Sequence, residues 1–402
     1  MFVQWLAVGS ISILSGFLLV RYLTVPPISM SWSLVGLLLG ITVVVGIIIR
    51  YFHRLEILLG VTLALAGFIG GYLASNSLFL AQEEVRSLPA VQPHGKSGGH
   101  TAVVYLTHGE PPGYSSMPWI ETFREFDHDQ VPFIPRPFRP FFFYMLRNEY
   151  LTSGGSPHNF IHQDMLNSLE QRFRAEGDED TRFYLSFLDS NPRPDEMVIR
   201  AINDGASRVI VSYVFLTKSS HTLAGDELVD ELNVPKYGVE LCKSAPLWDS
   251  TSLKQMFVNR ANRNLEGLDK SKVGILLVGH GQPAEWDKIY PTQTEQEILF
   301  RQDVIKLLVA DGYLEENITL GWMEFDQPNA TEAARELAQK GLQKIFVFAA
   351  SISATSIHSQ YDIPEAVHKA NLPASVEVVN LGAWDNDPLV IQAIYEKIKD
   401  CK

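Results

Sequence analysis

Four histidines share one local setting in the sequence. His108 and His280 each precede a glycine at the end of an apolar run, in the segments VVYLTHGEP and ILLVGHGQP. His221 and His358 each follow a later apolar run, in SSHTLAGDEL and SIHSQYDIP. Imidazole is a common ligand for first-row divalent metals and is the side chain that titrates near pH 7. These residues therefore predict metal binding and proton transfer.

The segments between these histidines repeat along the chain in the same order. In each half a proline is followed by a helical pattern, a glycine and an apolar strand, with Pro192 and Gly205 in the first half and Pro328 and Gly341 in the second. Proline and glycine lie 13 residues apart in both halves, and the histidine follows the glycine by 16 and 17 residues. An ordered repeat of this kind predicts two similar lobes.

Residues 101–402 alternate short apolar runs with amphipathic stretches, which predicts an α/β fold of parallel sheets flanked by helices. We assign a Rossmann-like lobe 1 to residues 101–270 and lobe 2 to residues 271–402. Ligands in such sheets bind at the carboxyl ends of the strands, where all four histidines are expected. Six strands are predicted: 102–107, 182–188, 208–216, 273–278, 319–323 and 344–349.

Lobe 2 also offers a carboxylate at a strand end. Glu324, in GWMEFDQP, is expected between the strands that carry His280 and His358, and these three side chains could hold a labile divalent ion. Lobe 1 has Leu188 at the equivalent position. Lobe 2 is therefore predicted to carry the working site, and the lobe 1 pair, His108 and His221, to be accessory or vestigial. The alternative is a solvated Glu324 and a helix-capping His358.

The first part of the chain has a different character. Residues 1–82 contain only four charged side chains, with a net charge of +2. Three uncharged runs of 18 to 24 residues, 1–20, 32–49 and 57–80, are each long enough to cross a bilayer as a helix. They predict an integral protein of the inner or plasma membrane, with the lipid bilayer as a partner and a polar linker at residues 83–100.

Charged residues near the apolar runs give opposing signals about the side of the membrane on which the main domain lies. Arg50 and Arg54 would place the main domain outside by the positive-inside rule, whereas Arg21, Arg86 and Lys96 would place it in the cytoplasm. The two cysteines, Cys242 and Cys401, belong to no CxxC motif and are interpreted as unpaired. This interpretation favours the cytoplasmic side.

Composition and missing motifs exclude several functions. Residues 83–402 carry a net charge of −15, which opposes nucleic-acid binding. The chain has no GxGxxG, Walker or GxSxG motif, so no nucleotide cofactor and no serine hydrolase are predicted. Thr107 and Gly279 precede the histidines where phosphohistidine phosphatases have arginine.

Residues 101–402 resemble ferrochelatase and its relatives, the class II tetrapyrrole chelatases. VGHGQP, at 278–283, is similar to the family's Ala-His-Gly-x-Pro, and HSQYDI, at 358–363, is similar to Glu-x-x-Tyr-Asp-Ile. His358 replaces the ferrochelatase glutamate, as in cobalt chelatases, and Glu324 is similar to a strand-end glutamate of those enzymes. Lobe 1 departs from the ferrochelatase Asn-x-Gly-Thr-Pro at residues 107–111.

The resemblance implies insertion of a divalent metal, Fe²⁺ or Co²⁺, into a porphyrin-type tetrapyrrole. The metal is then a substrate. His280 would accept protons and bind the metal, His358 would be a second ligand, and Glu324 a third ligand or an outer partner. Haem-accepting or pathway proteins are further partners. Five aromatic residues are candidate contacts to the macrocycle: Tyr114, Phe141, Phe142, Phe143 and Tyr290.

Two other functions fit the same residues. A haem, tetrapyrrole or metal carrier could keep the fold without turnover, and a membrane scaffold could use the domain only for interaction. The aromatic stretch at 132–144 has two interpretations as well, a packed element or an apolar lip that grips the macrocycle or enters the bilayer.

Overall fold

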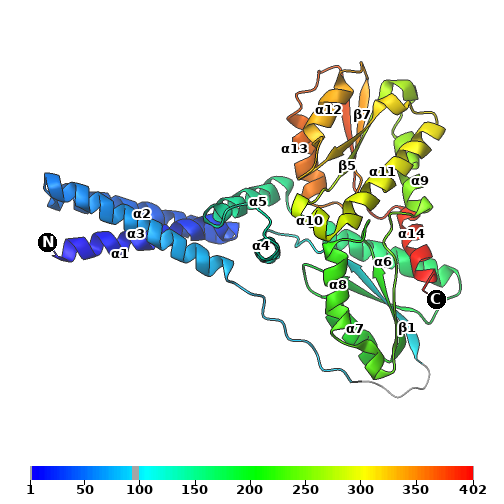
Figure 1. Ribbon diagram of the computed structural model, residues 1–402, viewed down its shortest axis with the longest axis horizontal. Coiled ribbons are helices and arrows are strands. Elements are labelled where there is room, and N and C mark those ends of the chain that lie inside the picture. Colours follow the sequence, from blue (N-terminus) through cyan, green and yellow to red (C-terminus); the bar gives the residue numbers. More distant parts are fainter. Residues whose placement is uncertain (1, 93–98, 402) are drawn as a thin grey trace. The chain divides into compact units, whose positions relative to one another are not determined.

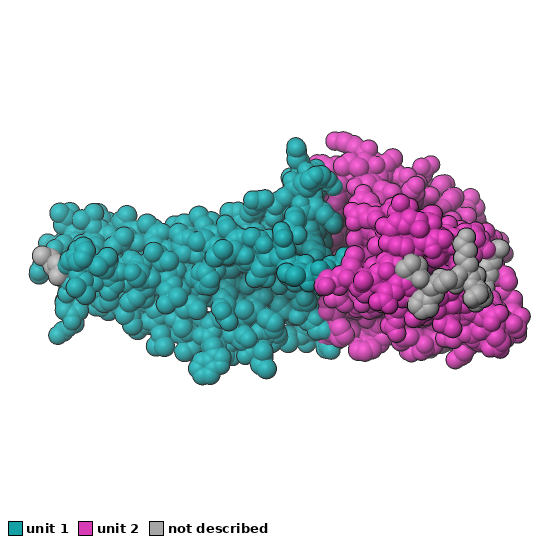
Figure 2. Space-filling model, turned by 90° about the horizontal axis from the view of Figure 1, so that it is seen from below, with its two compact units in different colours: residues 1–86, 113–154 teal, residues 87–112, 155–402 magenta. Residues whose placement is uncertain are grey.

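The computed structural model describes residues 2–92 and 99–401 and divides the chain into two compact units (Figure 2). Unit 1 comprises residues 1–86 and 113–154, and unit 2 comprises residues 87–112 and 155–402. Met1, Lys96 and the middle of the predicted linker lie outside the described residues. The predicted lobe 1 was continuous from residue 101, whereas the structure assigns 113–154 to the unit of the N-terminal helices.

Unit 1 contains three long apolar helices and a helical insertion (Figure 1). The three helices are long and apolar enough to cross a membrane, as the sequence predicts. Gly16 and Gly71 lie where a Cβ atom would be 2.0 Å from a carbonyl oxygen of the facing helix, so glycine permits the close approach of the first and third helices. The elements are α1 (Phe2–Thr24), α2 (Pro27–Tyr51), α3 (Arg54–Leu80), α4 (Met117–His128), η1 (Arg136–Phe138) and α5 (Arg139–Ser153).

The insertion at residues 113–154 packs on the ends of α1 and α3. The buried guanidinium of Arg147 donates hydrogen bonds of 2.8 Å to two carbonyl oxygens, that of Tyr22 in the last turn of α1 and that of Val25 just after the helix. Phe143 on α5 is fully buried, and its ring meets that of Phe79 edge-on at 4.9 Å. The aromatic stretch is therefore in large part a packed element of unit 1.

Unit 2 consists of two lobes, each built on a four-stranded parallel sheet (Figure 1). The strand orders are β2-β1-β3-β4 and β6-β5-β7-β8, so the second sheet repeats the topology of the first. This confirms the predicted α/β class. All six predicted strands are present, and two edge strands, β4 and β8, were not predicted.

The elements of unit 2 follow in chain order. Lobe 1 contains β1 (His100–Thr107), α6 (His158–Ala175), β2 (Arg182–Phe187), α7 (Pro194–Asn203), β3 (Ala206–Tyr213), α8 (Ser220–Asp230), η2 (Val234–Tyr237), β4 (Glu240–Lys243) and α9 (Thr251–Arg263). Lobe 2 contains η3 (Lys270–Lys272), β5 (Val273–Gly279), α10 (Ala284–Ile289), α11 (Pro291–Ala310), η4 (Glu315–Asn317), β6 (Ile318–Trp322), α12 (Ala330–Ala338), β7 (Lys344–Ala349), the π-helical turn η5 (His358–Asp362), α13 (Ile363–His368), β8 (Glu377–Gly382) and α14 (Pro388–Lys399).

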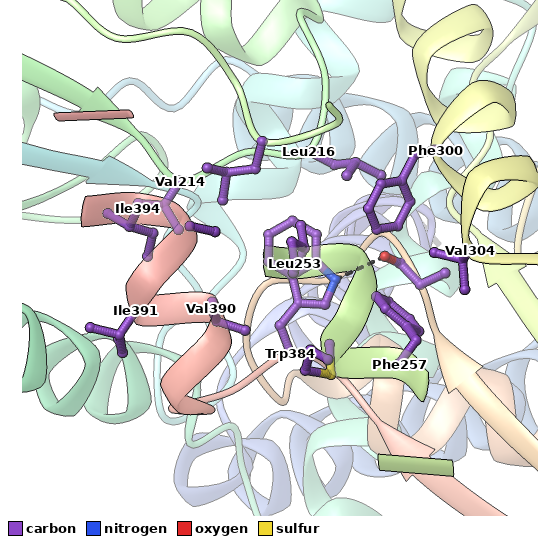
Figure 3. Packing of buried hydrophobic residues seen from close by; sticks show 14 of the residues in the cluster. Val214, Leu216, Leu253, Phe257, Phe300, Val304, Trp384, Val390, Ile391 and Ile394 are labelled. Carbon is purple, nitrogen blue, oxygen red and sulfur yellow. Dashed lines mark hydrogen bonds between the residues drawn. The ribbon is translucent and has the colours of Figure 1, made fainter. Parts of the chain in front are cut away.

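One hydrophobic core is shared by the two lobes. It combines side chains of α9 and of the segment after β3 from lobe 1 with side chains of α11 and α14 from lobe 2, among them Val214, Phe257, Phe300 and Ile394 (Figure 3). Trp384 is fully buried in this cluster, and its indole nitrogen donates a hydrogen bond of 2.8 Å to the carbonyl oxygen of Ala350. Because apolar burial is the main stabilising term, the lobes fold as one unit.

The two cysteines form a disulfide bond, so the interpretation of unpaired cysteines is wrong. Cys242 lies in β4 of lobe 1, and Cys401 follows α14 at the end of lobe 2. The two residues are 159 positions apart in sequence, and no local spacing signal accompanies them. The fold brings them together because α14 returns to pack beside lobe 1.

Loss of this disulfide is expected to destabilise unit 2. For a closed loop of this length, the chain-entropy model gives a contribution of roughly 3–5 kcal/mol to the free energy of unfolding. Urea unfolding of the full chain should therefore show a lower midpoint for Cys401→Ser than for the wild type, and addition of a reductant should lower only the wild-type midpoint. Equal midpoints in the presence and absence of reductant would contradict the disulfide.

Candidate active site

The structure brings the four histidines together as two pairs, one in each lobe. His108 follows β1 and His221 lies in the first turn of α8, with ring centres 4.2 Å apart. His280 follows β5 and His358 begins the π-helical turn after β7, with ring centres 5.8 Å apart. Each pair lies at the carboxyl end of its sheet, where α/β proteins bind ligands.

Hydrogen bonds orient three of these rings. The Nδ1 of His280 lies 2.7 Å from the carbonyl oxygen of Gly281, which can only accept, so Nδ1 donates and the lone pair of the neutral ring is on Nε2. The Nδ1 of His358 lies 2.6 Å from the carboxylate of Asp362, and that of His108 lies 2.6 Å from Asp189. Such partners are typical of imidazoles that bind metals through Nε2.

Buried side chains of α11 hold the loop of His280. The backbone N–H of His280 donates to Glu297 Oε1 at 2.5 Å, and Glu297 is buried. The fully buried guanidinium of Arg301 donates to the carbonyl oxygens of Leu277 and Gly321 and lies 3.9 Å from the ring centre of Trp322. A Cβ atom on Gly279 would be 2.5 Å from Glu297, so only glycine fits before His280.

Glu324, the predicted third ligand of lobe 2, follows β6 and lies near His280 and His358 without completing a metal site. The backbone N–H of Glu324 donates to the carbonyl oxygen of His280 at 3.1 Å, and the charge of Glu324 acts on His358. Within residues 2–92 and 99–401, no three His, Cys, Asp or Glu side chains are arranged as a complete metal site. Lobe 2 therefore presents an open set of donors.

Nearby carboxylates determine the pKa of His358 in lobe 2. Burial would lower the pKa of His358, but the hydrogen bond and charge of Asp362 oppose it and raise the pKa to about 10. Two further carboxylates, Glu324 and Glu110, contribute to this rise. His358 is therefore an imidazolium at neutral pH.

Lobe 1 contains an acid that the sequence comparison missed. The comparison placed Leu188 opposite Glu324, but the next residue, Asp189, points its carboxylate at His108. Burial would raise the pKa of Asp189, but the charge and the hydrogen bond of His108 instead lower it to about 2. Burial and the charge of His108 lower the pKa of His221 to about 3. Lobe 1 thus has its own His–carboxylate–His arrangement.

A carboxylate between the lobes joins the two histidine pairs. Glu110 lies in the loop after β1 and accepts a hydrogen bond from the hydroxyl of Ser156. The backbone N–H of Ile357 donates to both of its carboxylate oxygens, at 3.3 Å to Oε1 and 3.1 Å to Oε2. Ile357 immediately precedes His358. Burial raises the pKa of Glu110, and its hydrogen bonds and the nearby His358 act against that rise. No role was predicted for Glu110 from the sequence.

A buried polar network lies beneath the site. His162 is fully buried, and its Nδ1 lies 2.8 Å from the hydroxyl of Tyr105. Its Nε2 lies 3.2 Å from Thr107 in lobe 1 and 3.1 Å from Ser353 in lobe 2. The ring of His158 stacks edge-on against His162 at 4.5 Å. These histidines were not predicted, because they occur on a helix with no strand-end signal.

The aromatic candidates are divided between the two units. Tyr290 lies in unit 2, where its carbonyl oxygen accepts a hydrogen bond of 3.0 Å from Gln282, two residues after His280. The other four lie in unit 1. There Tyr114 donates to the carbonyl oxygen of Thr24 at 2.8 Å, Phe142 and Phe143 pack around Phe123, and Phe141 is exposed.

The fold and the site define the class of protein: a two-lobed α/β domain with oriented imidazole pairs at the carboxyl ends of its sheets. Residues 100–401 match the family model described as ferrochelatase. The chain therefore belongs to the ferrochelatase family, and the resemblance to class II chelatases is confirmed.

Several known proteins are similar to the chain. A sirohydrochlorin cobaltochelatase from Methanothermobacter thermautotrophicus is 33% identical over 98 residues, which cover 24% of the chain and 57% of that protein. A ferrochelatase from Synechococcus elongatus is 22% identical over 255 residues, covering 61% and 66%. The structure of SirB from Bacillus subtilis with Fe³⁺ has a TM-score of 0.51 at 13% identity, covering 75% of the chain and 95% of SirB, and shows the shared fold.

Acid is expected to destabilise unit 2 through His158. Burial lowers the pKa of His158 to about 4, below the ordinary value of 6.5. Below pH 6.5 the unfolded chain binds a proton that the folded chain does not, so stability is lost as the pH falls from 6.5 to 4, by up to about 3 kcal/mol. Urea unfolding at a series of pH values should show a shallower acid loss for His158→Gln.

The exposed His368 provides the matched control for this prediction. His368→Gln should reproduce the pH dependence of the wild type. Identical acid profiles for wild type and His158→Gln would contradict the assignment of a neutral, buried imidazole at position 158.

Proposed function

We propose that the protein is a membrane-anchored chelatase that inserts Fe²⁺ or Co²⁺ into a porphyrin-type tetrapyrrole. The observation that carries the proposal is the lobe 2 pair, in which a lone pair on His280 Nε2 lies beside a carboxylate-backed His358. Membership of the ferrochelatase family supports the reaction class. The relatives named above support the two metals.

Metal insertion replaces two pyrrole N–H protons of the macrocycle with a divalent ion. We infer that His280 Nε2 takes the two pyrrole protons one at a time and releases each to solvent, and that it contacts the incoming metal only while it is unprotonated. The carboxylates of Asp362, Glu324 and Glu110 attract the cation to this end of the sheet. Arrival of the metal at His358 displaces the proton that this ring carries at neutral pH, because only the neutral imidazole binds a metal.

An open donor set suits a metal that is a substrate. A closed cage would retain the ion, whereas a pair of imidazoles with an adjacent carboxylate can pass it on to the four nitrogens of the macrocycle. Binding energy from the macrocycle can bend the ring and expose those nitrogens. In this proposal Glu324 is a third ligand or an outer partner, and the pair His108 and His221 remains accessory.

Substitution of His280 tests the proposal. Purified full-length protein should give metal-dependent loss of a free-base tetrapyrrole spectrum when Fe²⁺ or Co²⁺ is supplied with protoporphyrin, coproporphyrin or sirohydrochlorin. His280→Ala should reduce kcat by about 100-fold or more, since general-base catalysis alone contributes about 10²–10⁴-fold. His108→Ala should retain activity within a few-fold and serves as the control.

The outcomes separate the alternatives. Loss of activity in His108→Ala but not in His280→Ala would transfer the working site to lobe 1. No turnover with any metal and macrocycle, together with a stable spectral shift on binding finished haem, would establish a carrier. Unchanged phenotypes for both variants would favour the scaffold.

The disulfide changes the inference about the membrane side. The cytoplasmic prediction relied on unpaired cysteines, whereas Cys242 and Cys401 are bonded, and disulfides persist mainly in oxidising compartments. Arg50 and Arg54 flank the turn between α2 and α3 and favour a cytoplasmic position for that turn. With three spanning helices, we propose that unit 2 lies on the opposite, oxidising side.

Labelling of introduced cysteines tests this orientation. The native cysteines are bonded and give no background, so a membrane-impermeant maleimide applied to intact cells should label Glu179→Cys in unit 2 and leave Tyr51→Cys unlabelled until the cells are opened. Both positions are exposed. The reverse pattern would place unit 2 in the cytoplasm.

A further inference from the structure

A polar cavity of about 260 Å³ lies at the C-terminal end of α3, within unit 1. One wall is the last turn of α3, and the other walls are α4, η1 and the start of α5. Its polar lining consists mainly of Asn76, Arg124, Asp127, Arg136 and Arg139. This site is separate from the histidine pairs, which belong to unit 2.

The cavity is basic in a chain that is acidic as a whole. Its lining has three guanidinium groups and one carboxylate, whereas the complete chain has a net charge of −13. Asp127 takes two hydrogen bonds from the buried Arg139, at 2.5 and 2.8 Å, and one from Arg136, at 3.0 Å. Arg124 donates a hydrogen bond of 2.8 Å to the carbonyl oxygen of Gln82, which carries no net charge. Within the lining, one carboxylate therefore faces three guanidinium groups, which favours an anion.

The cavity also contains a buried acceptor that lacks a donor. Asn76 is 4% exposed, and its amide nitrogen donates to the carbonyl oxygen of Arg136 at 2.8 Å. Among the described residues, no group donates to its side-chain oxygen, Oδ1. An unsatisfied buried acceptor is unfavourable, so a ligand with a hydroxyl or amine group would gain a hydrogen bond here.

The surroundings place the cavity at the surface of a bilayer. α3 has 27 residues, more than the ~20 that cross a hydrocarbon core, so its last turn reaches the headgroup level. Apolar side chains on the elements that form the cavity, α3, η1 and α5, are exposed: Leu78, Phe138, Phe141 and Met145. Apolar residues beside guanidinium groups are typical of a surface that enters the acyl region and binds headgroups.

We propose that this cavity binds the headgroup of an anionic phospholipid. Arg124 and Arg136 are exposed and pair with the phosphate diester, and a headgroup hydroxyl donates to Asn76 Oδ1. A glycerol-phosphate headgroup has both features, whereas a choline headgroup has no donor and no net negative charge. Unit 1 is then a lipid-selective element, in addition to an anchor.

The test uses the full-length protein in nanodiscs of phosphatidylcholine doped with phosphatidylglycerol. Native mass spectrometry measures the ratio of retained phosphatidylglycerol to phosphatidylcholine. Arg124→Gln and Arg136→Gln should each lower this ratio about fivefold, and the double variant by the product, since an arginine near an anionic surface contributes by about that factor. In nanodiscs doped with equal amounts of phosphatidylglycerol and phosphatidic acid, Asn76→Leu should remove the preference for phosphatidylglycerol, because the headgroup hydroxyl loses its acceptor.

The matched control is Arg50→Gln. Arg50 is also exposed and also belongs to unit 1, but it lies at the end of α2 next to the start of α3, at the other end of the third helix. Its substitution should leave the lipid ratio unchanged. Retention that is equal in wild type and double variant, or that falls equally in Arg50→Gln, would overturn the proposal.

A soluble phosphate is the other source of the same chemistry. Orthophosphate added at matched ionic strength should not displace phosphatidylglycerol, because the exposed apolar side chains contribute only to a lipid. Displacement by orthophosphate would overturn the lipid assignment. Circular dichroism of each variant confirms that the helical content is retained before the ratios are compared.

Discussion

The arrangement of the histidines depends on the hydrogen bond that the carboxylate of Glu110 accepts from the other lobe. Glu110 follows His108 by two residues, and it accepts the backbone N–H that immediately precedes His358. One side chain thus fixes the loop of a histidine in lobe 1 to the loop of a histidine in lobe 2. The bond from His162 to Ser353 and the bond from Gln360 to the Gly155 carbonyl oxygen connect the same two lobes. A charged acceptor in a buried position makes this connection strong and specific.

The two lobes use the same topology with different hydrogen-bond partners. In lobe 1 a carboxylate supports the histidine after the first strand, His108, whereas in lobe 2 a carboxylate supports the histidine after the third strand, His358. His280 is supported only by a peptide carbonyl. A carboxylate makes an imidazole more basic than a carbonyl does. Lobe 2 therefore combines a carboxylate-backed ring, His358, whose pKa is raised, with a ring, His280, that is oriented by a peptide carbonyl.

Much of the architecture could be predicted because it depends on short-range patterns. Hydropathy was sufficient for the three apolar helices, and the repeat from Pro192 to His221 and from Pro328 to His358 was sufficient for two similar sheets. The missed strands, β4 and β8, are edge strands of partly exposed residues, so they lack the continuous apolar pattern of the inner strands. The positions of the histidine pairs followed from the rule that parallel strands present their carboxyl ends together.

The remaining features depend on contacts between distant parts of the chain. Asp189 was missed because the lobes differ by one residue at the end of the second strand, so a position-by-position comparison found Leu188. Glu297 lies 17 residues after His280 and supports it from α11. The sequence of α11 resembles that of any amphipathic helix, so it does not mark Glu297 as a residue of the site. The bond between Cys242 and Cys401 has no local signal at all. The same holds for residues 113–154, whose apolar side chains pack on α1 and α3 instead of a sheet.

The division of the chain has a consequence for the proteolytic release of unit 2 from the three apolar helices. Because unit 1 contains residues 1–86 and 113–154, the chain passes between the units three times instead of once. A protease that cuts the linker after α3 separates the three apolar helices from the rest of the polypeptide, yet α4 and α5 remain docked on them through Arg147 and Phe143. A single nick would therefore leave unit 2 attached to the three apolar helices, and its release requires cuts at both remaining passages or the unfolding of unit 1.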